Sequence, residues 1–96
     1  MNEITIYGNL TKDVELYKAK NKDSVATMTV AVNRNAEETD FFTVKAFGKQ
    51  ADNASEYLQK GKGVVVHGSM QERKYDKKDG TKGSCWELIA RQIKYV

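Results

Sequence analysis

The sequence predicts an all-β domain, a five-stranded Greek-key barrel with one short helix between the third and fourth strands. Three features of the chain predict this fold class. Apolar and polar residues alternate with the two-residue period of half-buried strands in several segments. One segment in the middle changes to helical spacing and ends at a glycine. With 96 residues, of which 40% are apolar, the chain is long enough for one small core and too short for two, so residues 1–96 are expected to form a single domain.

The first two strands lie in the N-terminal third of the chain. Ile4 and Ile6 alternate with polar residues up to Gly8, and apolar residues alternate with threonines in VATMTVAVN, residues 25–33. The segment between them, KAKNKDS at 18–24, is polar and rich in turn-forming residues. We therefore expect residues 18–24 to form a loop that joins the first strand to the second.

The third strand, residues 39–48, has two chemically different faces because side chains alternate between the faces of a sheet. One face is apolar and carries Phe42, Val44 and Ala46. The other face is mixed and carries Phe41, Thr43, Lys45 and Phe47. The first face suits the core. Two aromatic rings with a lysine between them are costly to bury, so we expect the second face to meet solvent or a ligand.

A short helix is expected next. Residues 49–61 change to helical spacing, which is carried by Ala51, Ala54 and Leu58. We expect this helix to stop at Gly61 and to bury Tyr57 in the core beside Leu58.

A long hairpin is expected to close the chain. Residues 63–71 return to strand character, and residues 72–92 are typical of a hairpin with its turn at Asp79-Gly80. Residues 93–96 extend the last strand.

The net charge of +3 is unevenly distributed along the chain. Residues 61–96 hold eight basic and four acidic side chains, whereas residues 1–60 hold eight basic and nine acidic ones. A basic excess favours a polyanionic partner, although ordinary solvated lysines explain a charge of +3 about equally well.

Several function classes find no support in the composition. One His and one Cys make no zinc spacing, and there is no Gly-rich phosphate loop or carboxylate pair on an apolar cleft. We therefore expect no metal, no cofactor and no enzyme activity. No apolar run is long enough to cross a bilayer, so no membrane partner is expected either. The lone Cys85 suits a reducing compartment such as a cytoplasm.

Three strands, one helix and two further strands form the element order of the OB-fold, a partly open barrel that binds oligonucleotides across its sheet face and loops. An SH3-like barrel or another small α+β fold would show similar periodicities. On periodicity alone these alternatives remain open.

Several stretches resemble one family in order and spacing, namely YGNLTKDVEL, VATMTVAVNR, the run 39–68, Arg73-Lys74-Tyr75 and the KDG turn. They resemble the bacterial single-stranded DNA-binding proteins (SSB) over nearly the whole chain, and AFGKQA…YLQKG…V.G is the most specific part. The resemblance implies an OB-fold that assembles as a homotetramer, with a dimer as the alternative, and binds single-stranded DNA in replication, recombination and repair. It also implies a bacterial cytoplasm or nucleoid, with a chromosomal, plasmid or phage origin left open.

The resemblance further implies how the DNA is held. The family's base-stacking positions fall on Phe41, Phe47 and Tyr75. Unpaired bases expose faces on which any aromatic ring stacks, while basic side chains neutralise phosphates, so we expect binding without sequence choice. Trp86 is a candidate fourth platform, although a lone Trp in a strand more often packs against the core. The basic residues expected to meet phosphates are Arg34, Lys45, Lys49, Arg73, Lys74 and Lys77.

The chain departs from the family pattern in two places. The loop NRNAEETD, residues 33–40, has no Trp where many members carry one. No acidic tail with a hydrophobic tip follows Val96, so partners recruited through such a tail are not expected. The alternative function is an OB-fold protein-interaction subunit of the primosomal type with weak DNA binding. Exposure of Phe41, Phe47 and Tyr75 along one groove would favour strand binding, whereas their burial at a subunit contact would favour the alternative.

Overall fold

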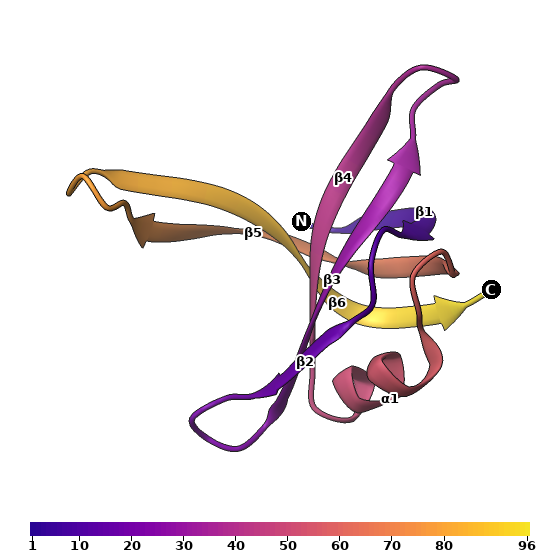
Figure 1. The fold of residues 1–96 in the computed structure, drawn as a ribbon, viewed down its shortest axis with the longest axis horizontal. Coiled ribbons are helices and arrows are strands. Elements are labelled where there is room, and N and C mark those ends of the chain that lie inside the picture. The colour runs from indigo at the N-terminus through magenta and orange to yellow at the C-terminus, as the bar shows by residue number, and fades with distance from the viewer.

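The computed structural model describes residues 1–96 as one sheet with a single helix beside it (Figure 1). The elements in chain order are β1 (Ile4–Leu10), β2 (Glu15–Lys18), β3 (Ser24–Asn33), β4 (Thr39–Phe47), α1 (Lys49–Tyr57), β5 (Gly63–Asp76) and β6 (Lys82–Tyr95). The helix has nine residues, and no helix is long and apolar enough to cross a membrane.

The sheet closes into a ring. Its strand order is β1-β5-β6-β4-β3-β2, and an additional pairing joins β1 to β3 through Asn9↔Ala31 and Leu10↔Val30. All neighbours are antiparallel except β4 and β6, which pair in parallel at Val44↔Leu88. This confirms the expected all-β OB-fold, with the helix between the strand that carries Phe41 and the strand that begins at Gly63.

One strand was not predicted. The short β2 follows the turn after β1 and pairs with β3, with Tyr17 opposite Val25, so the expected loop at 18–24 shrinks to residues 19–23. All four β2 residues are exposed. An edge strand without a buried face shows no alternation between core and solvent, and the two-residue period that reveals strands is therefore missing. The ring consequently has five strands, and β2 is a short sixth strand at the edge of the sheet.

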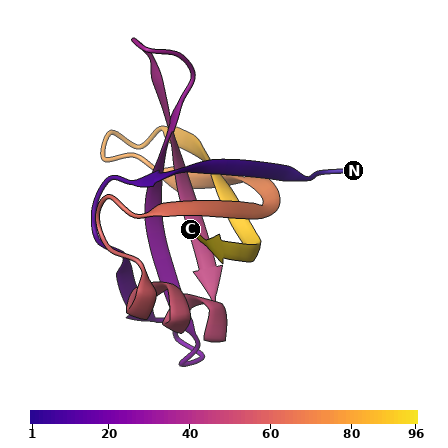
Figure 2. The ribbon, with the colours of Figure 1, turned by 90° about the vertical axis from the view of Figure 1, so that its right-hand side faces the viewer.

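The core lies inside the ring and confirms the predicted apolar face of β4. Val44 and Ala46 are fully buried, and Phe42 is partly buried against them. The largest fully buried side chains are Met28, Leu88, Val30, Val44, Val64 and Val66. Helix α1 lies against one end of the ring (Figure 2), where it adds Ala51 and Ala54 to the core, with Leu58 directly after it. Full burial of an apolar side chain such as Leu58 contributes about 1.5–3 kcal/mol.

The prediction for Tyr57 was wrong. The helix ends at Tyr57 rather than continuing towards Gly61, and Leu58 already has extended backbone angles, with φ −106° and ψ 135°. Leu58 therefore turns into the core while Tyr57 stays exposed. The Tyr57 ring meets the Tyr95 ring edge to face at a centroid distance of 5.9 Å.

Two hairpins project from the ring (Figure 1). The β3–β4 hairpin turns at residues 34–38, and the longer β5–β6 hairpin turns at Asp79-Gly80, as predicted. Gly80 has a φ of +86°, a conformation that suits glycine, and its N–H donates to Lys77 O at 3.0 Å. We call residues 71–86, the exposed outer part of the β5–β6 hairpin, the arm.

Candidate nucleic-acid interface

The mixed face of β4 is exposed, as its alternation predicts. Phe41 is 65% exposed and Phe47 is 49% exposed, one towards each end of the strand. They stand opposite Ala31 and Val25 of β3, and these short side chains leave the rings uncovered. An exposed ring on a sheet surface offers a flat apolar face to a stacking partner.

Tyr75 stands on the arm, opposite Gly83. Its ring lies across that glycine, because a Cβ added there would come within 2.7 Å of Tyr75 Cζ and 2.8 Å of Lys77 Cε. Because Gly83 has no side chain, the Tyr75 ring and the aliphatic part of Lys77 can lie over the backbone at this position. The two-residue period places Arg73 on the same face as Tyr75.

A groove lies where the arm joins the ring. Its volume is about 370 Å³, and it is lined by Tyr17, Ala19, Val25, Lys45, Phe47, Gln71, Arg73, Glu87 and Ile89. The strands β2 to β6 all contribute to it. It brings together Lys45, Phe47 and Arg73, three residues that the sequence predicted for DNA contact. Tyr17 and Glu87 also line it, and no sequence signal singled them out.

Glu87 is a buried carboxylate on the floor of this groove. Its Oε2 lies 4.0 Å from Lys45 Nζ and 3.7 Å from Arg73 Nη1. Lys45 also donates a hydrogen bond of 2.9 Å to Thr27 Oγ1. The side chain of Lys45 is only 13% exposed, whereas that of Arg73 is 61% exposed. Arg73 therefore reaches solvent, and Lys45 is held inside the groove.

Arg34 lies at the tip of the β3–β4 hairpin, outside this groove. Its guanidinium donates to Glu38 Oε2 at 2.7 Å and forms a bidentate pair with Asp40. The hydrogen bond from Arg34 lowers the pKa of Asp40, and the same hydrogen bond raises the pKa of Arg34. Two acidic partners thus neutralise Arg34 locally, so we expect it to contribute less to phosphate binding than the sequence suggested.

The other predicted cations are exposed but spread out. Lys49 begins α1, two residues after Phe47. Lys77 lies beside Tyr75, as described above. Lys74 follows Arg73 and therefore points to the opposite face of the arm.

Trp86 shares that opposite face of the arm. It pairs across the ladder with Glu72 and has the same parity along β6 as the buried Leu88, so its ring lies on the core side of the sheet. The arm extends past the core, however, and Trp86 is exposed there. It is not a packing residue in this chain, and it does not line the groove that holds Phe47.

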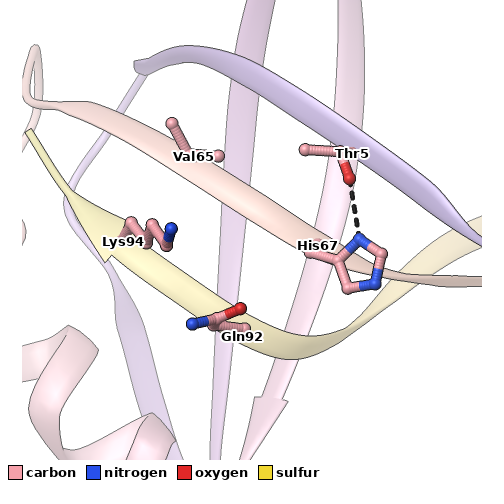
Figure 3. Close-up of a pocket in the computed structure, with 5 residues that line it drawn as sticks. All are labelled: Thr5, Val65, His67, Gln92 and Lys94. Carbon is pink, nitrogen blue, oxygen red and sulfur yellow. Dashed lines mark hydrogen bonds between the residues drawn. The ribbon is translucent and has the colours of Figure 1, made fainter.

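A second hollow lies on the outer face of β1, β5 and β6 and is lined by Thr5, Val65, His67, Gln92 and Lys94 (Figure 3). Its volume is about 310 Å³, and it carries no phenyl, phenol or indole ring. Thr5 Oγ1 and His67 Nδ1 share a hydrogen bond of 2.7 Å, but His67 Nε2 is 3.9 Å from Glu3 Oε1, too long for a hydrogen bond. No three His, Cys, Asp or Glu side chains converge as metal ligands anywhere in the chain. This hollow lacks the stacking rings and the paired cations of the groove.

Comparison with known proteins agrees with this geometry. A sequence model described as the Single-strand binding protein family matches residues 1–96. The Single-stranded DNA-binding protein 3 of Clostridium acetobutylicum is 37% identical over 102 residues, covering 100% of this chain and 71% of that relative. The Single-stranded DNA-binding protein 2 of Staphylococcus aureus strain COL is 40% identical, covering 100% of this chain and 73% of that relative.

The Single-stranded DNA-binding protein of Clostridium tetani is 36% identical and is covered over 70% of its length. The matched family consists of DNA-binding proteins that are not enzymes. Since both the family match and these identities extend over the whole chain, the chain belongs to the single-strand binding protein family.

Proposed function

We propose that this protein binds single-stranded DNA without sequence preference and protects it during replication, recombination and repair. Bases stack on Phe41, Phe47 and Tyr75, while Arg73 and the lysines of the arm neutralise phosphates. The observation that carries the proposal is the exposure of all three rings, two of them on one face of β4 and the third on the arm beside the groove. Base stacking of this kind is worth about 1–3 kcal/mol per base and does not require a particular sequence.

The charge of the arm supports the same function. Residues 71–86 hold five basic and three acidic side chains, and the lysines at 74, 77 and 78 are exposed. When these lysines neutralise phosphates they release the counterions condensed on the DNA, so binding depends on salt. The alternative, a protein-interaction subunit with weak DNA binding, needs the three rings buried in a subunit contact. All three rings are exposed in the single chain, but only Phe47 lines the groove, whereas Phe41 and Tyr75 lie outside it. The basic side chains of the arm around Tyr75 are what supports strand binding over this alternative.

We also propose that the chain assembles with copies of itself in a bacterial cytoplasm, as a tetramer or a dimer. From Ile4 to Gly8, β1 pairs with β5 on one side only, so its other edge keeps unpaired backbone groups. Such an edge is a template for pairing with another strand. Light scattering of the purified protein, with and without oligo-dT, measures this assembly directly.

The test of the function compares oligo-dT with a duplex of the same length. Binding is expected to be far tighter to the single strand, because a duplex hides its base faces from Phe41, Phe47 and Tyr75. The logarithm of the affinity should fall linearly with the logarithm of salt concentration, by about 0.7 for each phosphate neutralised. Equal affinity for the duplex would contradict the proposal.

A further inference from the structure

A fourth ring faces the same groove as Phe47. Tyr17 of β2 stands opposite Val25 of β3, and Val25 stands opposite Phe47 of β4. Residues directly opposite one another in neighbouring strands point to the same face of the sheet, so both rings rise on either side of Val25. Tyr17 is 49% exposed, as is Phe47, while Val25 is buried beneath them. The three residues form two aromatic walls and an apolar floor.

The spacing of the two walls suits one flat ring. Two strand spacings of about 4.8 Å put the Cα atoms of Tyr17 and Phe47 about 10 Å apart. A planar group stacked between two rings at van der Waals separation, about 3.5 Å on each side, needs about 7 Å between them. Both rings line the groove of about 370 Å³, which extends beyond them to Gln71, Arg73 and Glu87. Because Val25 is only 4% exposed between the rings, the two side chains must move apart to admit the base.

We propose that Tyr17 and Phe47 hold one nucleobase of the bound single strand between them, above Val25. This inference rests on the proposed function and adds a site to it. The occupant is a nucleobase because the site combines stacking walls with a polar end formed by Gln71, Arg73 and Glu87. The Gln71 amide both donates and accepts hydrogen bonds, so it meets the edge of any of the four bases.

The charges around the site also fit a nucleotide. Lys45 Nζ lies 5.7 Å from the centroid of the Tyr17 ring, near the outer limit of a cation–π contact, and so places a positive charge next to a stacked base. Lys45 and Arg73 together offset the negative charge of Glu87. The exposed Arg73 guanidinium then remains at the rim, where the sugar-phosphate chain leaves the site. Tyr17 thereby supplies a ring on the β2–β3 side, although the loop between β3 and β4 has none.

The test measures binding of five variants of the whole chain to an oligo-dT of about 16 nucleotides, the upper site size of one OB-fold. Tyr17→Ala is expected to weaken binding about 5- to 150-fold with unchanged salt dependence, and Tyr17→Phe to bind as the wild type does. The matched control is Tyr57→Ala, which removes a similarly exposed tyrosine outside the groove and should leave affinity unchanged. Because the Tyr17 ring helps to cover Val25, Tyr17→Ala should lower the melting temperature only slightly, and thermal melts check that it remains folded under the conditions of the titrations.

The double variant Tyr17→Ala/Phe47→Ala distinguishes a shared base from two separate ones. If both rings hold the same base, the combined loss is smaller than the product of the single losses, because either change already releases that base. Additive losses would assign the rings to different bases and overturn the shared site. Wild-type affinity for Tyr17→Ala, with weakened binding for Phe47→Ala, would overturn the inference and leave the proposed function standing. A wild-type protein that failed to bind oligo-dT would overturn both.

Discussion

The two projecting hairpins carry opposite charge, although each contains an arginine that the sequence marked for DNA contact. Residues 34–40 at the β3–β4 tip hold one basic and three acidic side chains, and Arg34 is paired with Glu38 and Asp40. The arm holds five basic and three acidic side chains, and Arg73 shares its one acidic partner, Glu87, with Lys45, so this cluster keeps a net positive charge. A basic residue is available to a phosphate only where its neighbours do not already neutralise it. This difference in charge predicts that the bound single-stranded DNA follows the arm and avoids the β3–β4 tip.

The largest expected effect is a difference in the loss of DNA affinity between alanine variants of the rings nearest the two hairpin tips, Tyr75 and Phe41. Tyr75→Ala should weaken binding to oligo-dT about 5- to 150-fold. Phe41→Ala should fall near the lower end of that range, because Phe41 follows Asp40 and the acidic tip repels phosphates. Equilibrium titrations at one salt concentration measure both losses. A larger loss for Phe41→Ala would break the comparison.

Thermal melts control for unfolding in this experiment. Tyr75 and Phe41 are exposed, so their alanine variants should melt as the wild type does. Phe42→Ala truncates a partly buried ring on the opposite face of β4 and should lower the melting temperature, at a cost of about 3 kcal/mol. Early melting of Phe41→Ala would mean that its face supports the fold and not the DNA.

A smaller effect is expected on the salt dependence of DNA binding, which should differ between charge variants of the two hairpins. Lys77→Ala should reduce the salt slope of oligo-dT binding by about 0.7, the value for one phosphate contact on a single strand. Arg34→Ala should leave the slope unchanged, because Glu38 and Asp40 already pair with that guanidinium. Titrations between about 50 and 200 mM salt give the slopes. If Arg34→Ala lowered the slope as much as Lys77→Ala, both tips would contact phosphates.

The smallest effect concerns pH. A hydrogen bond from Arg34 lowers the pKa of Asp40, and hydrogen bonds from Thr81 lower the pKa of Asp79 at the arm tip. Because these folded-state pKa values lie below the unfolded ones, each carboxylate stabilises its tip above about pH 4, and this contribution is lost as pH falls through the lowered pKa. NMR titration of the carboxyl carbons measures both values. In Arg34→Ala only the pKa of Asp40 should rise; a matching rise at Asp79 would show that the two tips are not independent.

Features that depend on the local period were predictable from the sequence. Alternation alone separated Phe41 and Phe47 from Val44 and Ala46, since neighbouring side chains in a strand always take opposite faces. The Asp79-Gly80 turn fixed the register of the arm and so the face of Tyr75. These predictions needed no knowledge of tertiary contacts.

Features that depend on closure of the ring were not predictable. Glu87 lies 42 residues after Lys45 in the sequence, and the two side chains meet only because β4 and β6 pair in parallel. The phosphate contact predicted for Lys45 stays a prediction. In the fold this side chain is ion-paired with Glu87. Tyr17 was missed because β2 has no buried face. Tyr57 was misplaced because helical spacing does not tell where a helix ends.

The position of Glu87 has a mechanical consequence for the arm. This buried carboxylate forms ion pairs with Arg73 of β5, at the root of the arm, and with Lys45 of β4, in the ring, over distances of 3.7 Å and 4.0 Å. A phosphate that draws Arg73 outward exchanges one anion for another and leaves Glu87 with Lys45 alone. Breaking of the Arg73–Glu87 ion pair and binding of the DNA strand are then thermodynamically coupled. Each favours the other by the same free energy. We therefore expect the angle of the arm to report whether the groove is occupied.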